Sequence, residues 1–284
     1  MNHAQTVLLV GCGDLGIRVA AQLPAGDYRP LGVRRSPEKL PVQLQGPAAD
    51  YTRSGQLGFV ADLAPEVVVA TLVPLEFSDA GYRAGFRDAM ANLVEVLAIS
   101  KPRLAIMVSS TRVYAERDGG WVDETSALAV GEPRSAAIIE AESLLLSSGL
   151  NAAVVRFGGI YGDPEGRLLE RIASGRVSAA SPRRFTNRIH RDDAAGFLAH
   201  LITRNDCSPC PVYNGVDDCP APAHEVETWI AERLGVTPRE YLPAAAAGHK
   251  RCRNLALHQS GYRLQYPDYR AGYGEVLGRR RAPR

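Results

Sequence analysis

The sequence predicts an α/β fold in which helices cover both faces of a parallel sheet, followed by a smaller C-terminal lobe. Three observations predict it. Short apolar runs alternate with longer helical patterns over the first two-thirds of the chain, and a glycine-rich turn follows the first run. From about Gly162 the pattern becomes irregular and rich in Gly, Pro and Arg. The 284 residues, 45% of them hydrophobic, suffice for one large domain with a smaller partner.

The elements can be placed in chain order. The strand-like runs are Thr6–Val10, Leu31–Arg34, Val67–Leu72, Arg103–Ser109 and Ala152–Phe157. The helical patterns are Leu15–Leu23, Tyr82–Ile99 and Pro133–Ser148, with two later ones at Arg191–Thr203 and His224–Leu234. We therefore predict a sheet domain over residues 1–161 and a mainly substrate-binding lobe over residues 162–284, some segments of which return to the sheet. Open α/β sheets bind ligands at their C-terminal edge.

Charge and composition exclude several classes of protein. The formal net charge of +2 gives no global field that would favour nucleic acid or an anionic membrane. No apolar run approaches the ~18 residues of a membrane span. The five cysteines and the absence of a secretory signal predict reduced thiols in a cytoplasm. The basic tail, Arg279–Arg284, is interpreted as a frayed, solvated terminus rather than a nucleic-acid arm. A homodimer is compatible with the sequence but not required by it.

The segment Gly11–Gly16, with the sequence GCGDLG, fits the pattern G-x-G-x-x-G. It follows a strand directly and opens an amphipathic helix, which is the context that distinguishes a dinucleotide site from a plain glycine turn. Gly11 permits the tight turn, Gly13 lets a pyrophosphate approach the backbone, and Gly16 lets the helix pack on the strand. Asp14 and Leu15 begin the helix, whose free N–H groups would face the phosphates. The sequence thus predicts a Rossmann-type domain, the alternative being a turn without ligand.

The second strand indicates the type of nicotinamide cofactor. NAD-binding forms place an acid at its end to hold the ribose hydroxyls, whereas this chain has Arg34 and Arg35 there. Two guanidinium groups would attract the extra 2′-phosphate, so we predict NADP rather than NAD; the alternative is a pair of solvated arginines. Asp50, which follows a short strand near Ala48, is expected either to meet the adenine edge or to serve as a turn residue.

Five further segments carry a family resemblance: Met107–Tyr114, Trp121–Glu124, Arg156–Gly162, Asn187–Asp193 and Pro211–Asp217. Together with the glycine motif they resemble the extended or atypical short-chain dehydrogenase/reductases, the NAD-dependent epimerase/dehydratase family, as far as about Gly272. The resemblance implies that Ser110 is the catalytic Ser or Thr of that family. It also implies that the segment containing Arg156 and Gly158 lines the nicotinamide.

One departure from the family concerns its Tyr-x-x-x-Lys pair. If Glu142 matches the family's acid, Arg134 replaces the tyrosine and Ile138 the lysine. Arginine keeps its proton near neutral pH and cannot act as a general acid there. Its planar fork could still hold a substrate carboxylate, phosphate or enolate while Ser110 donates a second hydrogen bond.

A permanent cation at this position is also expected to meet an anion, either substrate or an acid such as Asp123 or Glu124. Proton transfer would then need another group, such as Tyr114, Tyr161, His190, a substrate group or water. The alternative is that Arg134 is only a solvated residue near the start of a helix.

Two other clusters were weighed. A zinc site could be drawn from Cys207, Cys210, Cys219 and His224, but a strand-like run lies between the cysteines and the second pair lacks the short spacing of a zinc ribbon, so we predict no metal. The arginines of the run Arg183–Arg191 lie where related enzymes approach an anionic substrate, or else form a solvated basic loop. His190 fits a packed, hydrogen-bonded histidine better than a catalyst.

Two functional hypotheses remain. The first is an NADP-dependent oxidoreductase or epimerase/dehydratase-like enzyme that acts on a small anionic hydroxy or keto substrate with non-standard acid/base residues. The second is a catalytically silent, NADP-binding sensor or scaffold. Ser110 and the arginine-lined lobe favour the enzyme, and the missing Tyr and Lys favour the silent protein.

Overall fold

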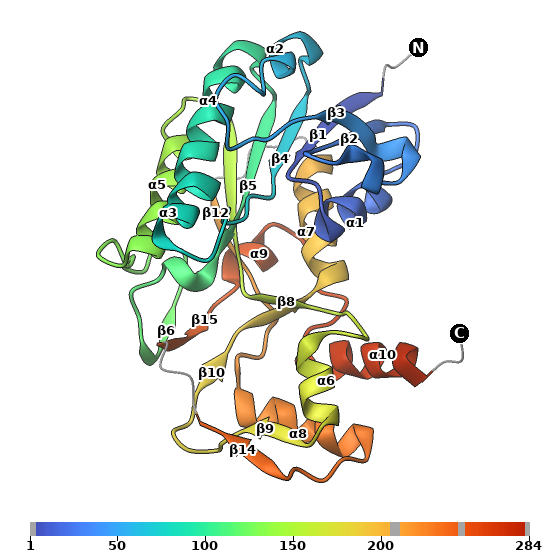
Figure 1. Cartoon of the computed structure of the whole chain (residues 1–284), viewed down its shortest axis with the longest axis vertical. Coiled ribbons are helices and arrows are strands. Elements are labelled where there is room, and N and C mark those ends of the chain that lie inside the picture. Colours follow the sequence, from blue (N-terminus) through green and yellow to red (C-terminus); the bar gives the residue numbers. More distant parts are fainter. Residues whose placement is uncertain (1–3, 205–210, 244–247, 282–284) are drawn as a thin grey trace. The chain divides into compact units, whose positions relative to one another are not determined.

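The computed structural model describes residues 4–204, 211–243 and 248–281 (Figure 1). The chain divides into two compact units, each of which is considered by itself. Unit 1 consists of Met1–Tyr114, Leu128–Arg156 and Ala195–Tyr213, and unit 2 of Ala115–Ala127, Phe157–Ala194 and Asn214–Arg284. Across the described ranges, no helix combines the length and the apolar character that crossing a membrane requires.

Unit 1 is built on a seven-stranded sheet in the order β12-β7-β5-β4-β1-β2-β3. The ladders of β1 with β2 and β4, of β2 with β3, and of β4 with β5 are parallel. The strands are β1 Gln5–Val10, β2 Tyr28–Arg34, β3 Gln45–Ala48, β4 Val67–Ala70, β5 Leu104–Ser110, β7 Ala152–Phe157 and β12 Val212–Gly215. The predicted fold class is confirmed. The strand order reverses between β1 and β4, and such a switch point is where open α/β sheets bind ligands.

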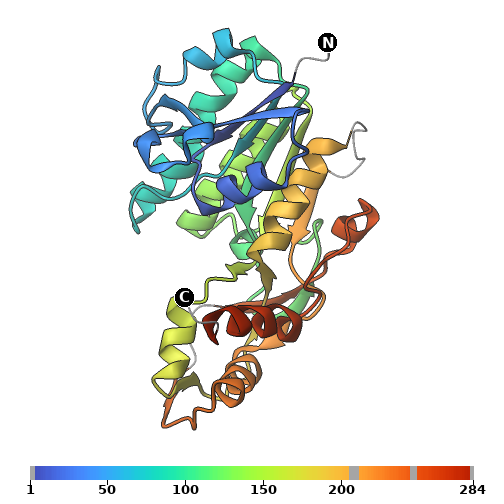
Figure 2. The ribbon, with the colours of Figure 1, turned by 90° about the vertical axis from the view of Figure 1, so that its right-hand side faces the viewer.

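Helices cover both faces of this sheet. They are α1 Asp14–Gln22, α2 Phe59–Leu63, α3 Asp79–Tyr82, α4 Ala89–Ser100, α5 Pro133–Leu146 and α7 Arg191–Thr203, with 3₁₀ turns at Pro37–Lys39, Val42–Leu44 and Thr111–Val113. Helices α4 and α5 lie on one face, and α1 and α7 on the other (Figures 1 and 2). Because helices cover both faces of the sheet, the run Val7–Val10 of its strand β1 is fully buried. A π-helical turn, Arg83–Asp88, interrupts the single helix predicted over Tyr82–Ile99.

In its described residues, unit 2 combines helices with short paired strands. The helices are α6 Arg167–Ala173, α8 Ala223–Leu234, α9 Leu255–Gln259 and α10 Tyr269–Arg281. The strands are β6 Asp118–Val122, β8 Gly159–Tyr161, β9 Arg176–Ser178, β10 Phe185–Thr186, β11 Arg188–His190, β13 Ala221–Pro222, β14 Glu240–Leu242 and β15 His249–Cys252. Its apolar core joins α6, α8 and α10 through residues such as Ile172, Ile230 and Val276, each fully buried.

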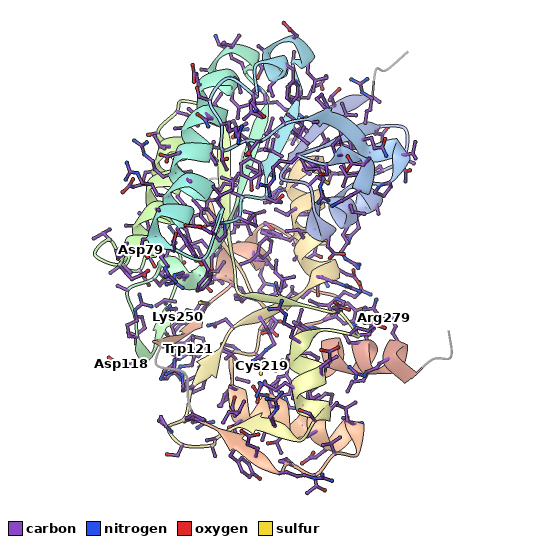
Figure 3. All side chains as sticks on the ribbon, in the orientation of Figure 1. Asp79, Asp118, Trp121, Cys219, Lys250 and Arg279 are labelled. Carbon is purple, nitrogen blue, oxygen red and sulfur yellow. The ribbon has the colours of Figure 1, made fainter. Side chains whose placement is uncertain are left out.

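The basic tail corrects one expectation. Arg279 lies within α10, where its Nε atom is 2.6 Å from Glu275 Oε1 one turn earlier (Figure 3). It also donates a hydrogen bond to the carbonyl oxygen of Gly162, and Arg280 donates one to Pro164. The prediction of a frayed terminus was therefore wrong for the first residues of the tail, because the helix and these contacts hold them.

Candidate functional site

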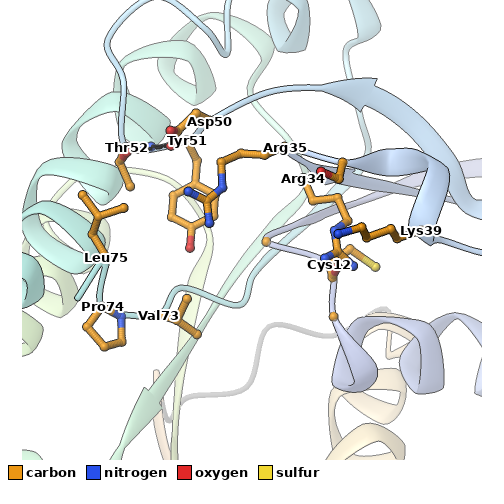
Figure 4. Close-up of a pocket in the computed structure, with 13 residues that line it drawn as sticks. Cys12, Arg34, Arg35, Lys39, Asp50, Tyr51, Thr52, Val73, Pro74 and Leu75 are labelled. Carbon is orange, nitrogen blue, oxygen red and sulfur yellow. Dashed lines mark hydrogen bonds between the residues drawn. The ribbon is translucent and has the colours of Figure 1, made fainter. Parts of the chain in front are cut away.

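A pocket of about 580 Å³ lies in unit 1 at the C-terminal ends of β1, β2 and β4 (Figure 4). It is lined by the glycine turn, by the segment after β2, by the loop after β3 and by the loop after β4. These residues are Gly11, Cys12, Gly13, Arg34, Arg35, Ser36, Lys39, Asp50, Tyr51, Thr52, Val73, Pro74 and Leu75. The volume is typical of a small-molecule site, and the position is the switch point of the sheet.

The glycine turn has the geometry that the motif predicts. Gly11 has φ of +75°, and a Cβ atom there would lie 2.6 Å from the carbonyl oxygen of Thr71, so that only glycine fits. A Cβ atom on Gly13 would meet nothing nearer than Gly11 O at 4.0 Å, which leaves that side of the turn open. A Cβ atom on Gly16 would lie 2.8 Å from the sulfur of Cys12, so glycine allows α1 to pack closely.

The start of α1 offers free donors beside this opening. Gly13 is the N-cap residue of the nine-residue helix, and no side chain caps it. The first N–H groups of a helix carry a partial positive charge and suit a pyrophosphate. Asp14 is the first helical residue, and its carboxylate pairs with Arg18 at 2.9 Å, one turn further along α1. Leu15 follows it in the first turn.

Cations dominate the wall of the pocket beyond β2. Arg34 and Lys39 lie beside the turn at Cys12, and Arg35 extends toward Tyr51 (Figure 4). Arg34 Nη1 donates a long hydrogen bond of 3.5 Å to the carbonyl oxygen of Cys12. Asp50 is the one carboxylate among the residues given above for this wall. The donor set of three cations and open backbone N–H groups fits a phosphate-bearing dinucleotide.

Asp50 both lines the pocket and shapes a turn. Its Oδ1 atom accepts hydrogen bonds from the Thr52 backbone N–H at 3.1 Å and from the Thr52 hydroxyl at 2.6 Å. Burial by itself would raise the pKa of Asp50, but these hydrogen bonds, with Arg35 and Arg53, lower it below its usual value. Asp50 is therefore anionic at neutral pH and firmly placed.

The sequence analysis missed several of these lining residues. Lys39 follows the arginine pair by a few positions and was not connected with it. Tyr51 and Thr52 follow β3, which is a short polar strand with no hydrophobic signal. The loop Val73–Leu75 follows β4 directly, so the rule that ligands bind at the C-terminal ends of strands could have found it.

Arg156 and Tyr114 lie together in the core of unit 1. Arg156 Nη2 is 2.6 Å from Glu142 Oε2, and both side chains are less than 5% exposed. Arg156 Nη1 donates to the Tyr114 hydroxyl at 3.2 Å, and Ser109 donates to the other oxygen of Glu142. Burial would lower the pKa of Arg156, but Glu142 outweighs it and the pKa is raised. Tyr114 has no exposed surface, and Arg156 does not line the pocket.

Ser110 and Arg134 lie on different elements of unit 1, the strand β5 and the helix α5. Ser110 ends β5, and its Oγ atom accepts the backbone N–H of Arg112 at 3.2 Å, which caps a 3₁₀ turn. Arg134 lies in the first turn of α5, where its Nε atom is 2.8 Å from Asp79 Oδ1. Its guanidinium also lies 4.7 Å from the ring centroid of Phe77. Ile138, one turn later, is 1% exposed, so that position faces the core.

The terminal nitrogens of Arg134 remain available. Its one recorded hydrogen bond uses Nε, and within residues 4–204, 211–243 and 248–281 neither Nη atom has a partner. The hydrogen bond that Arg134 donates to Asp79 raises the pKa of Arg134 above its already high value, so the group stays cationic. The acid that meets Arg134 is therefore Asp79, on α3, which the sequence analysis did not consider.

The remaining predicted site residues lie in unit 2. Gly158 donates its N–H to Gly215 O at 3.1 Å, and a Cβ atom there would lie 2.8 Å from Asn187 O. Asp123 accepts hydrogen bonds from Thr125 and Ser126, which lower its pKa. Glu124 accepts the backbone N–H of Asn214 at 3.0 Å. His190 is fully buried.

Two of the four candidate zinc ligands, Cys207 and Cys210, lie outside the described residues. Of the two other candidate ligands, His224 is hydrogen-bonded through Nδ1 to Ser178 O at 2.7 Å, and burial raises the pKa of the Cys219 thiol. The absence of a structural metal stays a prediction.

Comparison with known proteins places this geometry in a family. The NAD(P)H-binding family matches residues 11–205. A 3-diazoavenalumate denitrifying reductase from a Streptomyces species is 28% identical over 262 residues, which is 85% of each chain. A solved protein from Methylobacillus flagellatus, described as related to NAD-dependent epimerases/dehydratases, is 32% identical with a TM-score of 0.82, over 99% of this chain and 100% of the other.

A human epimerase family protein solved with NADPH has the same fold, with 20% identity and a TM-score of 0.75 over 96% of this chain and 99% of its own. These likenesses agree with the glycine turn, the sheet order and the pocket at the switch point. The chain therefore belongs to the NAD(P)H-binding family, as an atypical short-chain dehydrogenase/reductase of the epimerase/dehydratase type.

Proposed function

We propose that this chain is an NADP-dependent reductase of a small, anionic, electron-poor substrate. The observation that carries the proposal is the cationic wall of the unit 1 pocket, where Arg34, Arg35 and Lys39 surround the end of β2 and no acid replaces them. A guanidinium fork binds phosphate bidentately, whereas the ribose hydroxyls of NAD call for a carboxylate at this strand end. When bound, the cofactor supplies a hydride.

Different residues of this chain are suited to different parts of the cofactor and the substrate. Gly13 and the start of α1 are suited to the pyrophosphate, and the three cations to the 2′-phosphate. We assign to Ser110 and to the free Nη atoms of Arg134 the task of holding the substrate's anionic group. An arginine in the tyrosine position orients an anion but cannot deliver a proton near neutral pH. The proton of the product therefore comes from solvent or from the substrate itself.

Reduction is favoured over epimerisation by one comparison. The Streptomyces relative is named as a reductase of 3-diazoavenalumate, the anion of a diazo-substituted acid. A strongly electrophilic diazo acceptor takes up hydride at carbon and releases its two nitrogen atoms as N2, in accord with the word denitrifying in that name, without the acid catalysis that a keto group needs. Such a substrate class is consistent with the loss of the Tyr and Lys pair. We therefore include diazo acids, with keto and hydroxy acids, in the substrate class to be screened.

A silent NADP-binding sensor is the second candidate. The observation that favours it is the burial of Ile138, at the lysine position of the family's pair, and of Tyr114. Arg134, at the tyrosine position, cannot release a proton near neutral pH. The two candidates differ in turnover. Oxidation of NADPH by at least one keto or diazo acid, followed by its absorbance, supports the reductase, as does reduction of NADP by a hydroxy acid in the reverse direction. Nucleotide binding with no turnover of keto or diazo acids with NADPH, and none of hydroxy acids with NADP, supports the sensor.

The first prediction concerns cofactor choice. NADPH is expected to bind at least tenfold more tightly than NADH, a difference of about 1.4 kcal/mol, because the 2′-phosphate meets the cationic wall. Replacing Arg34 and Arg35 together with alanine should erase the difference, as measured by fluorescence titration of both nucleotides. Arg53→Ala, an exposed arginine outside the pocket wall, is the matched control and should keep it. Equal affinities in the unmodified protein would contradict the proposal.

The second prediction concerns Arg134. We expect Arg134→Ala to lower kcat/KM at least tenfold for the acid that is reduced fastest, while NADPH affinity stays unchanged. Arg134→Lys should restore only part of the activity, because an ammonium group lacks the planar fork. Asp79→Asn separates the two roles of this arginine. If it reproduces the loss seen with Arg134→Ala, the arginine acts only through its ion pair, and the proposed contact with substrate is wrong.

A further inference from the structure

Unit 2 contains a second pocket, of about 300 Å³, between β9, β10, the start of α8 and β15. Every residue that lines it belongs to unit 2, so its description is independent of unit 1. The wall is partly apolar, through Ala179, Pro182, Phe185 and Ala223. The volume lies at the lower end of the range for small-molecule sites, which is about 300–1,000 Å³. The pocket therefore suits a ligand with a single ring rather than a nucleotide.

Several polar groups of this wall are already satisfied. Glu227 is the one carboxylate among the lining residues, and its Oε1 atom is 2.7 Å from Arg171 Nη2. It also accepts hydrogen bonds from the backbone N–H and the hydroxyl of Ser178. The Thr186 hydroxyl donates to the carbonyl oxygen of Ala221 at 3.0 Å. The charge of Glu227 is thus neutralised by Arg171, and neither hydroxyl proton is free for a ligand.

The two imidazoles of the wall are oriented by the backbone. His249 Nδ1 accepts the backbone N–H of Phe185 at 3.2 Å, so its ring proton lies on Nε2. Burial and then Arg184 lower the pKa of His249, so it is neutral at pH 7. His224 Nδ1 lies 2.7 Å from the carbonyl oxygen of Ser178, which only accepts, so His224 donates from Nδ1. Therefore the Nε2–H of His249 is the donor that the imidazoles offer to an anion.

Arg184 supplies the charge of the pocket. Its neighbour Arg183 is paired with Glu225 at 2.8 Å. No ion pair is recorded for Arg184 with any acid in the described ranges, and its half-buried side chain lines the pocket. Arg184 and His249 line the same pocket, and the positive charge of Arg184 lowers the pKa of His249. A half-buried cation without a counterion is costly, and the cost is relieved when an anion binds.

We infer that this pocket is a binding site for a small aromatic carboxylate. The carboxylate lies on the guanidinium of Arg184 and the Nε2–H of His249, and the ring packs against the apolar part of the wall. One guanidinium without an ion pair, beside the neutral imidazole of His249, matches a monoanion, whereas inorganic phosphate brings up to two charges and no apolar surface. The inference concerns binding by unit 2 and does not depend on the proposed reductase activity.

The test uses the full chain without nucleotide and 4-hydroxybenzoate as the probe, with binding measured by calorimetry. We expect one equivalent to bind, and 4-hydroxybenzamide, which lacks the charge, to bind at least tenfold more weakly. Arg184→Ala and Arg184→Gln should each weaken the carboxylate at least tenfold. Arg183→Ala is the matched control, because that neighbouring arginine already has an acidic partner, and it should change the affinity less than threefold. Thermal unfolding of each variant confirms that it is folded.

Two results would overturn the inference. One is inorganic phosphate or acetate binding as tightly as 4-hydroxybenzoate, which would make the pocket a simple anion site. The other is unchanged affinity in both folded Arg184 variants. The protein with both Arg34 and Arg35 replaced should bind the carboxylate normally, since those residues belong to unit 1. Failure of the carboxylate site is thereby distinguished from failure of the proposed function, which is measured by NADPH binding and oxidation.

Discussion

Replacing Glu142 with alanine is expected to lower the free energy of unfolding by about 3–5 kcal/mol, the cost of breaking a buried ion pair from one side. The guanidinium of Arg156, 4% exposed, would keep its charge and lose the carboxylate that lies 2.6 Å from its Nη2 atom. The Ser109 hydroxyl would lose its acceptor as well. Urea denaturation, followed by circular dichroism, measures the decrease in the free energy of unfolding. A change of less than about 1 kcal/mol would show that the pair contributes as little as a surface one.

Two controls separate charge from packing. Glu140→Ala, on the exposed face of the same helix, should change stability by no more than about 0.5 kcal/mol, because that side chain is 51% exposed. The double replacement Glu142→Leu with Arg156→Met removes both charges and keeps similar volume. It should recover most of the lost stability, since apolar replacement of a complete buried pair is often neutral. If the double variant is no more stable than Glu142→Ala, the loss comes from packing and not from the unpaired charge.

Gly13→Ala is expected to weaken NADPH at least 100-fold, about 2.7 kcal/mol, while leaving the protein folded. Gly13 has φ of −121°, which alanine adopts readily, and the nearest atom to an added Cβ is 4.0 Å away. The methyl group therefore fits the protein, at a cost of about 1 kcal/mol or less at a helix N-cap. The added methyl group lies, however, on the side of the turn where the pyrophosphate would approach the backbone, so it blocks the ligand.

The neighbouring glycine provides the contrast. In Gly11→Ala, a positive φ and a Cβ atom 2.6 Å from Thr71 O strain the turn itself, so both thermal stability and NADPH affinity should fall. Fluorescence titration and thermal unfolding, run on both variants, distinguish a blocked ligand from a damaged turn. NADPH affinity in Gly13→Ala equal to that of the unmodified protein would mean that the phosphates do not approach this turn.

The parts of the site that the sequence determined are those formed by neighbours along the chain. A strand, a glycine turn and a helix in direct succession define where Gly11 and Gly13 lie, because the backbone conformation of such a turn depends on a few adjacent residues. Arg34 and Arg35 end the next strand, and parallel strands bring their C-terminal ends to the same edge. Both arginines and the glycine turn therefore line one pocket.

What only the tertiary structure decided is which distant side chains meet. Arg134 pairs with Asp79, 55 positions earlier, and the second pocket joins Arg184 to His224 and His249 from separate segments. Arg156 turned out to be a core cation because Glu142 lies beside it. Hydrophobic periodicity indicates which face of a helix or strand is buried, but it carries no information on which buried polar groups contact one another. Those partners depend on how elements pack across the sheet and within the second unit, and this packing is set by contacts between residues far apart in the chain.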